Sequence, residues 1–212
     1  MHLLAVSKTC PGVSVREAFA AGQRDFGENY VQESLAKIAE LADLRADSGD
    51  PIRWHLIGPL QSNKAREVAA RFDWVHAVDR MKLAQRLSDL RPPELAPLQV
   101  CLQINISGED SKSGVAPEAA LALAREVAAL PRLQLRGLMA IPEPGADLAA
   151  QREPHRALRR LMEAMNAEGL ALDTLSIGMS ADLEAAIAEG ATWVRIGTAI
   201  FGSRPAKSEP IP

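Results

Sequence analysis

The sequence contains few cysteines and no long apolar run. Its two cysteines, Cys10 and Cys101, lie far apart and match no metal-binding or redox spacing. Such usage is typical of a reducing compartment. No apolar run approaches the ~20 residues that span a bilayer, and the opening MHLLAVSKT is too short for a signal peptide. We therefore expect a cytoplasmic protein without a membrane partner.

An excess of positive charge is also missing. Lysine and arginine total 24 against 27 aspartates and glutamates, for a net charge of −3. Binding to nucleic acid needs a clustered basic face. The nearest candidate is a set of four arginines at helical spacing: Arg152, Arg156, Arg159 and Arg160. We interpret them as the solvated outer face of a helix and expect no nucleic-acid partner.

Short apolar runs rich in β-forming residues alternate with longer helical patterns along the 212 residues. The predicted strands cover residues 3–6, 24–26, 52–57, 74–78, 100–106, 133–139, 174–177 and 193–196. The predicted helices cover residues 15–21, 31–41, 63–70, 81–90, 117–130, 154–168 and 181–188. Three glycines stand where helix C-caps are expected, namely Gly22, Gly169 and Gly190. Regular alternation of this kind predicts parallel strands joined by crossover helices.

Two α/β architectures fit that alternation. Repeats of ~25 residues suit a small TIM barrel. A doubly wound open sheet is the alternative, and it predicts a glycine fingerprint after the first strand. The first strand instead ends in Val6-Ser7-Lys8-Thr9, which lacks those glycines. We therefore predict a single (β/α)8 TIM barrel over residues 1–204, followed by a disordered tail over residues 205–212.

Lys8 is the strongest candidate for a reactive side chain. Active sites of such barrels lie at the C-terminal ends of the strands, and Lys8 closes the first one. A lysine partly desolvated at the barrel mouth is a better nucleophile toward aldehydes, because desolvation disfavours its ammonium form. The alternative is that Lys8 simply extends into solvent. Lys64 and Lys112 also fall near this rim, but neither follows a strand directly.

The ends of the last two strands predict a phosphate site. Gly178-Met179-Ser180 follows the seventh strand, and Arg195-Ile196-Gly197-Thr198 ends the eighth. TIM barrels commonly bind phosphate at these two positions. Glycine lets an oxyanion approach backbone N–H groups, and a helix beginning at Ala181 with Ser180 as its N-cap would add its dipole. The alternative is that Ser180 is only a cap and Gly197 only a turn.

The histidines indicate no metal. His55 and His76 lie in the third and fourth predicted strands, flanked by tryptophan, leucine or valine. We interpret them as satisfied residues of the core or its lining. No cluster of histidine and carboxylate residues has metal-ligand spacing, so the sequence predicts no metal site.

Eight sequence blocks resemble the pyridoxal phosphate homeostasis protein family (YggS/PROSC-like). They cover residues 5–9, 26–33, 54–64, 103–106, 111–114, 136–141, 176–180 and 194–202. The resemblance therefore extends over nearly the whole chain and keeps the order of the blocks. It departs from the family in one respect, because family members usually carry a helix before the first strand. We expect this difference to affect the outer surface of the barrel and no cofactor-binding motif.

The resemblance implies a fold similar to the N-terminal barrel of bacterial alanine racemase. It implies that Lys8 carries pyridoxal 5′-phosphate (PLP) as a Schiff base, that Asn29 lies beside the cofactor ring and that Arg195 faces the pyridine nitrogen. It further implies that the phosphate is held by three residues, namely Ser180, Gly197 and Thr198. These positions agree with those reached above from the strand ends.

Three functions remain open at this point. The first is a PLP carrier in vitamin B6 homeostasis, without a dedicated turnover reaction, monomeric and passing PLP to apo-enzymes. The second is a small PLP-dependent amino-acid racemase, which by the two-base route needs an acid/base group on each face of the substrate. In alanine racemase one such group is a tyrosine from an additional domain of the partner subunit, whereas this chain's only tyrosine is Tyr30. The third is a barrel that binds another phosphate compound.

Overall fold

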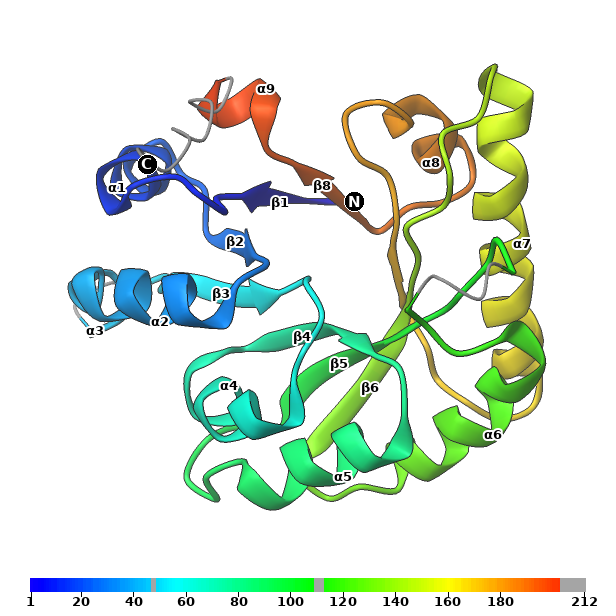
Figure 1. Cartoon of the computed structure of the whole chain (residues 1–212), viewed down its shortest axis with the longest axis horizontal. Helices are drawn as coiled ribbons and strands as arrows, with labels where there is room; N and C mark the ends of the chain where they lie inside the picture. The colour runs from blue at the N-terminus through cyan, green and yellow to red at the C-terminus, as the bar shows by residue number, and fades with distance from the viewer. Residues whose placement is uncertain (47–48, 109–112, 203–212) are drawn as a thin grey trace, which may run out of the picture.

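Eight parallel strands close into a barrel with helices around its outside (Figure 1). The computed structural model describes residues 1–46, 49–108 and 113–202. The strands are β1 (His2–Val6), β2 (Asp25–Glu28), β3 (Arg53–Leu56), β4 (Trp74–Val78), β5 (Leu98–Gln103), β6 (Leu133–Met139), β7 (Thr174–Ser176) and β8 (Trp193–Ile196). The predicted tail at residues 205–212, and Lys112, lie outside the described residues.

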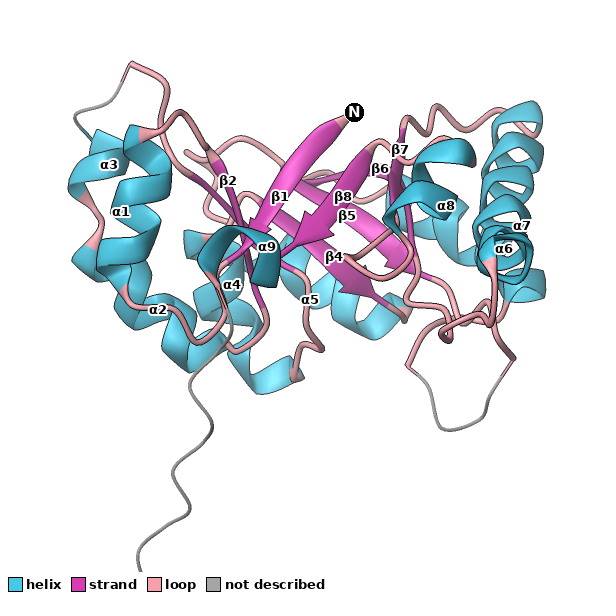
Figure 2. Cartoon of the chain, turned by 90° about the horizontal axis from the view of Figure 1, so that it is seen from above, coloured by secondary structure: helices cyan, strands magenta, loops and turns pink. Residues whose placement is uncertain are grey.

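Helices connect the strands and flank them on both sides when the barrel is seen from above (Figure 2). They are α1 (Gly12–Ala20), α2 (Val31–Glu40), α3 (Asp43–Ala46), a 3-10 turn η1 (Ser62–Lys64), α4 (Ala65–Arg71), α5 (Met81–Leu90), α6 (Pro117–Ala128), α7 (Leu148–Ala167), α8 (Leu183–Ala188) and α9 (Thr198–Phe201). Among the described residues, no helix is both long enough and apolar enough to cross a bilayer.

The first and last strands pair with each other, and this pairing closes the barrel. Leu4 of β1 lies beside Arg195 of β8, while Ala5 lies beside Phe26 of β2. All neighbouring strands are parallel and follow one another in chain order. The predicted TIM barrel is therefore confirmed, and the doubly wound sheet is excluded. In a closed parallel barrel the C-terminal ends of all strands meet at one rim.

Four predicted helix starts differ from the observed ones: α1 begins at residue 12 rather than 15, α4 at 65 rather than 63, α7 at 148 rather than 154, and α8 at 183 rather than 181. Helix α7 begins at Leu148 because Asp147 caps it, accepting a hydrogen bond from the Ala150 amide at 2.8 Å. Pro154, predicted near its start, lies inside this helix. Ser180 is not an N-cap, because residues 180–182 form a turn and α8 begins only after Asp182. The Asp182 Oδ1 atom accepts from the Met179 amide at 2.7 Å and stabilises that turn.

The predicted C-cap glycines are confirmed. Gly22, Gly169 and Gly190 all have positive φ angles. At the end of α8, the Gly190 amide donates to the Ile187 carbonyl, and the next amide donates to the Ala186 carbonyl, each at 3.0 Å. These two bonds form the Schellman motif. It places Gly190 at a positive φ angle, which strains residues that carry a side chain.

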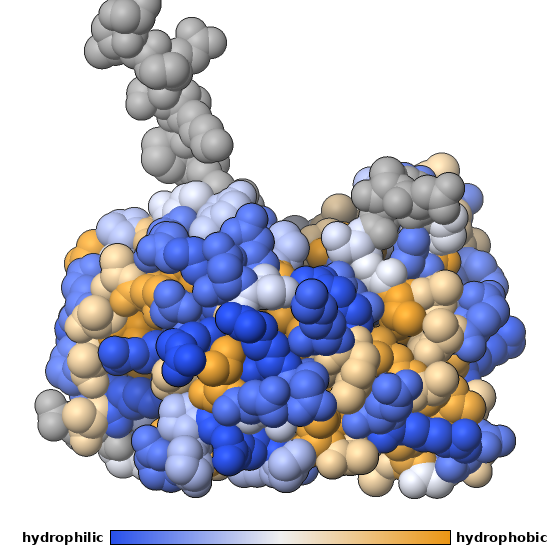
Figure 3. Space-filling model, turned by 60° about the horizontal axis from the view of Figure 1, so that its bottom comes forward, coloured by the Kyte–Doolittle hydropathy of each residue, from blue (hydrophilic) through white to orange (hydrophobic). Residues whose placement is uncertain are grey.

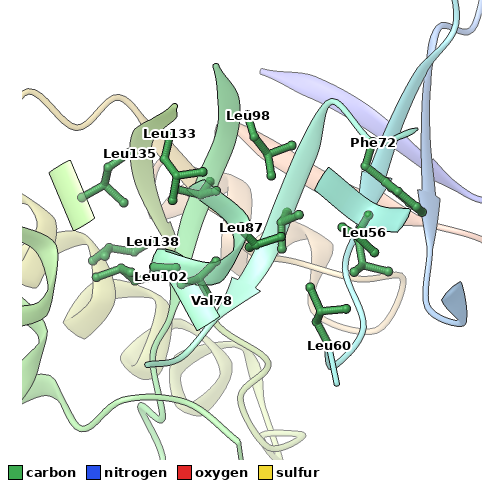
Figure 4. Packing of buried hydrophobic residues seen from close by; sticks show 14 of the residues in the cluster. Leu56, Leu60, Phe72, Val78, Leu87, Leu98, Leu102, Leu133, Leu135 and Leu138 are labelled. Carbon is green, nitrogen blue, oxygen red and sulfur yellow. The ribbon is translucent and has the colours of Figure 1, made fainter. Parts of the chain in front are cut away.

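The larger part of the core lies between the barrel and its helices. Figure 4 shows leucines of this cluster, including Leu56, Leu98, Leu102 and Leu138 from strands β3, β5 and β6. A smaller apolar cluster lies inside the barrel and consists of Leu4, Val6, Ile57, Trp74, Ala77, Cys101, Met139 and Trp193. The alternation along β1, with Leu4 and Val6 inward and Ala5 outward, follows from the period of two in a strand.

The arginines of α7 are not simply a solvated face. Arg152, Arg156 and Arg159 converge on Glu189 at the end of α8, with N–O distances of 2.7, 3.0 and 3.4 Å. Only 2% of Glu189 is exposed. Although burial by itself raises a carboxyl pKa, the hydrogen bonds from Arg152 and Arg156 lower the pKa of Glu189 to about 2. The sequence-based interpretation holds for Arg160, which is exposed.

Charged and apolar residues are interspersed over the face shown in Figure 3. The blue and orange areas alternate there, and neither kind of residue forms a continuous surface across the molecule. Isolated apolar residues on a folded surface are ordinary and indicate no partner. The features that indicate function lie at the barrel rim.

Candidate functional site

A cavity of about 310 Å³ opens among the C-terminal ends of the strands. Its lining consists of Val6, Lys8, Asn29, Ile57, Ile141, Met179, Ser180, Ala181, Arg195, Gly197 and Thr198. All six residues predicted to form the cofactor site are in this set. The structure therefore brings them together from both ends of the chain, and the cavity has the size of a small-molecule site.

Lys8 lies in a tight turn two residues beyond Val6, where both the predicted strand and β1 end. The following residue, Thr9, has a φ of 63°. That left-handed conformation costs a β-branched residue roughly 1–2 kcal/mol. A hydrogen bond of 2.5 Å from the Thr9 amide to Glu33 Oε1 stabilises the turn. The half-buried Lys8 side chain is thus presented to the cavity by a fixed piece of backbone.

A buried ion pair between Lys37 and Glu28 holds the backbone just before this turn. Lys37 Nζ lies 2.7 Å from Glu28 Oε1 and donates to the Ser7 carbonyl at 2.7 Å. The Ser7 hydroxyl also donates to Glu28 Oε1, at 2.6 Å. Burial raises the pKa of Glu28, and the neighbouring Lys37 ammonium opposes that rise. The arrangement fixes the peptide that precedes Lys8.

Lys37 lies within the predicted helix over residues 31–41, and its contacts with Glu28 and Ser7 were not predicted. Glu33 and Lys37 are four residues apart on α2, and this spacing was the one available signal. Of the other lysines considered, Lys64 lines a neighbouring cavity with Arg80 and Tyr30. Among the described lysines, Lys8 is the one that lines the cavity at the rim.

Asn29 carries a buried polar atom that no protein group satisfies among the described residues. Its Oδ1 atom has no hydrogen-bond partner there. The nearby backbone is tightly packed, since a Cβ atom on Gly58 would lie 2.4 Å from the Asn29 carbonyl oxygen. A buried polar atom without a partner costs about 1–3 kcal/mol. A ligand that donates a hydrogen bond to Asn29 from the cavity would remove that cost.

Two hydroxyl groups and a turn of backbone face the cavity from the last two strands. Ser180 and Thr198 line it, with Gly197 beside Thr198. Gly197 is the N-cap of α9, whose amides of Ile200 and Phe201 both donate to the Gly197 carbonyl. Hydroxyl and backbone N–H donors together form a set suited to phosphate oxygens. Because Ser180 does not cap α8, its hydroxyl is not needed for that purpose.

Arg195 reaches the cavity from inside the barrel and is only 4% exposed. Its Nη1 donates to the Ser176 carbonyl and, at 3.1 Å, to the Ser176 hydroxyl. Its Nη2 donates to the Ala140 carbonyl at 2.9 Å. Burial lowers the pKa of Arg195 to about 10, so it remains charged at neutral pH. These partners hold its guanidinium in one plane beside the cavity.

The two histidines are fully buried inside the barrel, as their apolar neighbours predicted. His76 Nδ1 lies 2.8 Å from the Ser176 hydroxyl, and His76 Nε2 lies 3.0 Å from His55 Nδ1. His55 Nε2 lies 3.1 Å from Asp25 Oδ1. Asp25 is held in turn by Arg53, through Nε at 2.7 Å and Nη2 at 2.9 Å. A continuous row of polar groups therefore extends from Arg195 across the barrel.

We expect the protein to lose stability as the pH falls below about 6.5. Burial lowers the pKa of His55 and, more strongly, of His76, so both rings stay neutral in the folded state. In the unfolded chain each ring takes up a proton near pH 6.5. The unfolded state then binds more protons, and the unfolding free energy decreases by about 1.4 kcal/mol per histidine per pH unit.

Chemical denaturation between pH 8 and pH 5 measures this loss. A His76→Asn variant is expected to show about half the slope of the unmodified protein below pH 6.5, because one buried titrating ring is gone. A flat profile for the unmodified protein over this range would contradict the prediction.

A sequence profile described as "Alanine racemase, N-terminal domain" matches residues 1–205. A protein of Pseudomonas aeruginosa named pyridoxal phosphate homeostasis protein is 65% identical over 202 residues, which cover 95% of this chain and 84% of the relative. A protein of Escherichia coli with the same name is 54% identical over 202 residues, covering 95% and 85%.

Solved structures with a similar fold support the same relationship. PipY of Synechococcus elongatus with PLP bound has a TM-score of 0.85 and 42% identity, covering 95% of this chain and 92% of PipY. An alanine racemase of Clostridium difficile has a TM-score of 0.76 at 13% identity, covering 98% of this chain and 53% of the racemase. At that identity the racemase shows a shared fold and nothing about chemistry.

Proposed function

The chain belongs to the pyridoxal phosphate homeostasis protein family, whose barrel is that of the alanine racemase N-terminal domain, and we propose that it binds PLP in intracellular vitamin B6 homeostasis. PLP is held there as a Schiff base on Lys8, without a dedicated turnover reaction. The observation that carries this proposal is that one cavity brings together an amine, two hydroxyls and a buried guanidinium.

The donors and acceptors around the cavity fit the parts of PLP. PLP supplies an aldehyde that condenses with an amine, together with a phosphate and an aromatic ring nitrogen. Lys8 contributes the amine at the cavity wall. Ser180 and Thr198 provide hydroxyl donors for the phosphate, and Gly197 allows its close approach to the backbone. In this proposal Asn29 lies beside the ring, and its Oδ1 atom accepts a hydrogen bond from the ring hydroxyl of PLP.

Arg195 disfavours fast chemistry at the α-carbon of an amino acid. A guanidinium can only donate hydrogen bonds, so a ring nitrogen facing it must be an acceptor and therefore unprotonated. PLP enzymes that need a strong electron sink place an acidic residue there instead. The racemase alternative also lacks its usual second base, since Tyr30 lines the neighbouring cavity rather than the one that contains Lys8.

Solvent deuterium exchange distinguishes the carrier from the racemase. With PLP-loaded protein and alanine, we expect exchange at the α-carbon far slower than turnover by a dedicated enzyme, because the unprotonated ring stabilises the developing charge poorly. Exchange on the order of 10 per second or faster would overturn the non-enzymatic proposal. The yellow absorbance band of the imine must be present in the same sample, and a colourless protein in excess PLP would instead favour another phosphate compound.

We further propose that the loaded protein acts in the cytoplasm as a monomer and delivers PLP to apo-enzymes. Neither nucleic acid nor a membrane is a partner in this proposal. Incubating an apo-enzyme with the loaded protein, in the presence of a trap for released PLP, tests delivery. Recovery of enzyme activity despite the trap is expected, and no recovery would overturn direct transfer.

A further inference from the structure

The polar row inside the barrel connects five strands. It begins at Arg195 on β8, continues through Ser176 on β7, His76 on β4 and His55 on β3, and ends at Asp25 on β2. Its adjacent polar atoms are 2.8–3.1 Å apart. We call these five residues the interior chain. They come from sequence positions far apart and meet only because the sheet is closed.

Both ends of the interior chain have a fixed hydrogen-bonding role. Arg195 can only donate. Asp25 receives two bonds from Arg53, and these bonds keep its carboxyl ionised although burial opposes this, so it can only accept. His55 Nε2 must therefore carry the proton that it shares with Asp25, which leaves His55 Nδ1 as an acceptor.

The proton positions on His76 and Ser176 follow in the same way. His76 Nε2 must carry a proton to donate to His55 Nδ1, so His76 Nδ1 accepts from the Ser176 hydroxyl. The Ser176 oxygen in turn accepts from Arg195 Nη1. Every donor then points from Arg195 toward Asp25, both rings are neutral, and no bond in the chain is left unmade. An extra proton on His55 Nδ1 would face the Nε2–H of His76, and one on His76 Nδ1 would force the Ser176 hydroxyl to turn its own proton away from the ring.

Aromatic side chains enclose the interior chain. The His55 ring stacks on Trp74, with centroids 5.4 Å apart and planes 6° apart, and lies 4.9 Å from the Trp193 ring. Both tryptophans belong to the apolar cluster inside the barrel. Hydrogen bonds in such an environment are strengthened, and a broken one is costly.

We propose that His55, His76 and Ser176 are positioning residues that hold the Arg195 guanidinium toward the ring nitrogen of PLP, through a hydrogen-bond chain that ends on the Asp25 carboxylate. The chain is not a proton relay, because a guanidinium does not release its proton in this role. The Asp25 carboxylate at its far end is paired with Arg53, and the carboxylate whose charge favours the ionised form of Arg195 is that of Asp182. The inference rests on the proposed function, since it concerns the orientation of Arg195 toward PLP.

Nitrogen-15 NMR of the His55 and His76 rings tests the interior chain in the unmodified protein, without any variant. We expect His55 and His76 both to be neutral at pH 7, each with its proton on Nε2. A proton on Nδ1 of either neutral ring, or an imidazolium, would overturn the inference.

A pair of matched variants tests the effect on the cofactor. Ser176→Ala removes the hydroxyl that links His76 to Arg195. Thr192→Val removes a hydroxyl, on the residue just before β8, that bonds both the amide and the carbonyl of Leu175 on β7. We expect Ser176→Ala to raise the Kd for PLP about tenfold and to shift the imine absorbance maximum. Thr192→Val should stay within about twofold and keep the maximum.

The outcomes separate this inference from the proposed function. No imine band in the unmodified protein would overturn the proposed function and the inference with it. A normal band in the unmodified protein, combined with Ser176→Ala values equal to those of Thr192→Val, would overturn the inference alone. If Ser176→Ala does not fold, the ring tautomers decide the question.

Discussion

Lys8→Ala should abolish covalent attachment of the cofactor. Borohydride reduction of the unmodified, PLP-loaded protein is expected to place the pyridoxyl label on the peptide that contains Lys8. Among the described lysines, Lys8 is the one that lines the cavity beside the hydroxyls of Ser180 and Thr198. In the variant the label should disappear, because no other described amine borders that cavity. Peptide mapping by mass spectrometry measures both results.

A matched control is Lys64→Ala, since Lys64 lines the neighbouring cavity and follows no strand. This variant should keep the full label. Lys8→Ala should still bind some PLP without covalent attachment, because the phosphate donors remain. A label found mainly on Lys64 or Lys112 in the unmodified protein would contradict the assignment of Lys8.

Pyridoxal, which lacks the phosphate, should bind at least ~100-fold more weakly than PLP. If Ser180, Thr198 and the backbone at Gly197 hold the phosphate as proposed, pyridoxal lacks two or three charge-assisted hydrogen bonds that PLP makes. Such bonds contribute several kcal/mol in total, and each ~1.4 kcal/mol corresponds to a factor of ten in affinity. Titration of the imine absorbance with each compound gives the two Kd values.

A variant that combines Ser180→Ala with Thr198→Val provides the control for the phosphate prediction. It should weaken PLP binding strongly and leave pyridoxal binding almost unchanged, so that the two affinities converge. Equal affinities for the two compounds in the unmodified protein would refute a phosphate site at this rim. A similar loss for both compounds in the variant would show that the substitutions act on the whole cavity rather than on the phosphate.

The fold could be predicted from the sequence because each element has a strong local signal. Strands β4, β6 and β8 have the bounds that their apolar, β-rich runs predicted. Lys8, Ser180, Gly197 and Thr198 could be selected for a geometric reason, whereas Asn29 and Arg195 entered with the resemblance to the family. Once a barrel is assumed, every strand end lies at the same rim, so the residues after each strand are neighbours whatever their separation in the chain.

The partners of buried charged residues could not be predicted in this way. Strand alternation shows which face His76 occupies, but not which residue meets it from the opposite side of the barrel. For the same reason Glu189 was not recognised as the partner of Arg152 and Arg156, which are far away in sequence. The wrong start of α8 has a local cause: the Asp182 carboxylate bonds the Met179 amide and His155 and makes no capping bond, so capping preferences could not locate this start.

The two cysteines differ in exposure, so a dye attached to one of them can report whether PLP is bound. Cys101 lies fully buried in the barrel interior, where burial raises the pKa of its thiol and suppresses its reactivity. Cys10 is only half-buried, and its Sγ lies 3.7 Å from the Lys8 carbonyl oxygen. A thiol-selective dye should therefore attach to Cys10 alone, two residues from the proposed site of PLP attachment. Energy transfer from the dye to the imine would then follow loading and release of the cofactor in real time, even in mixtures with other PLP proteins.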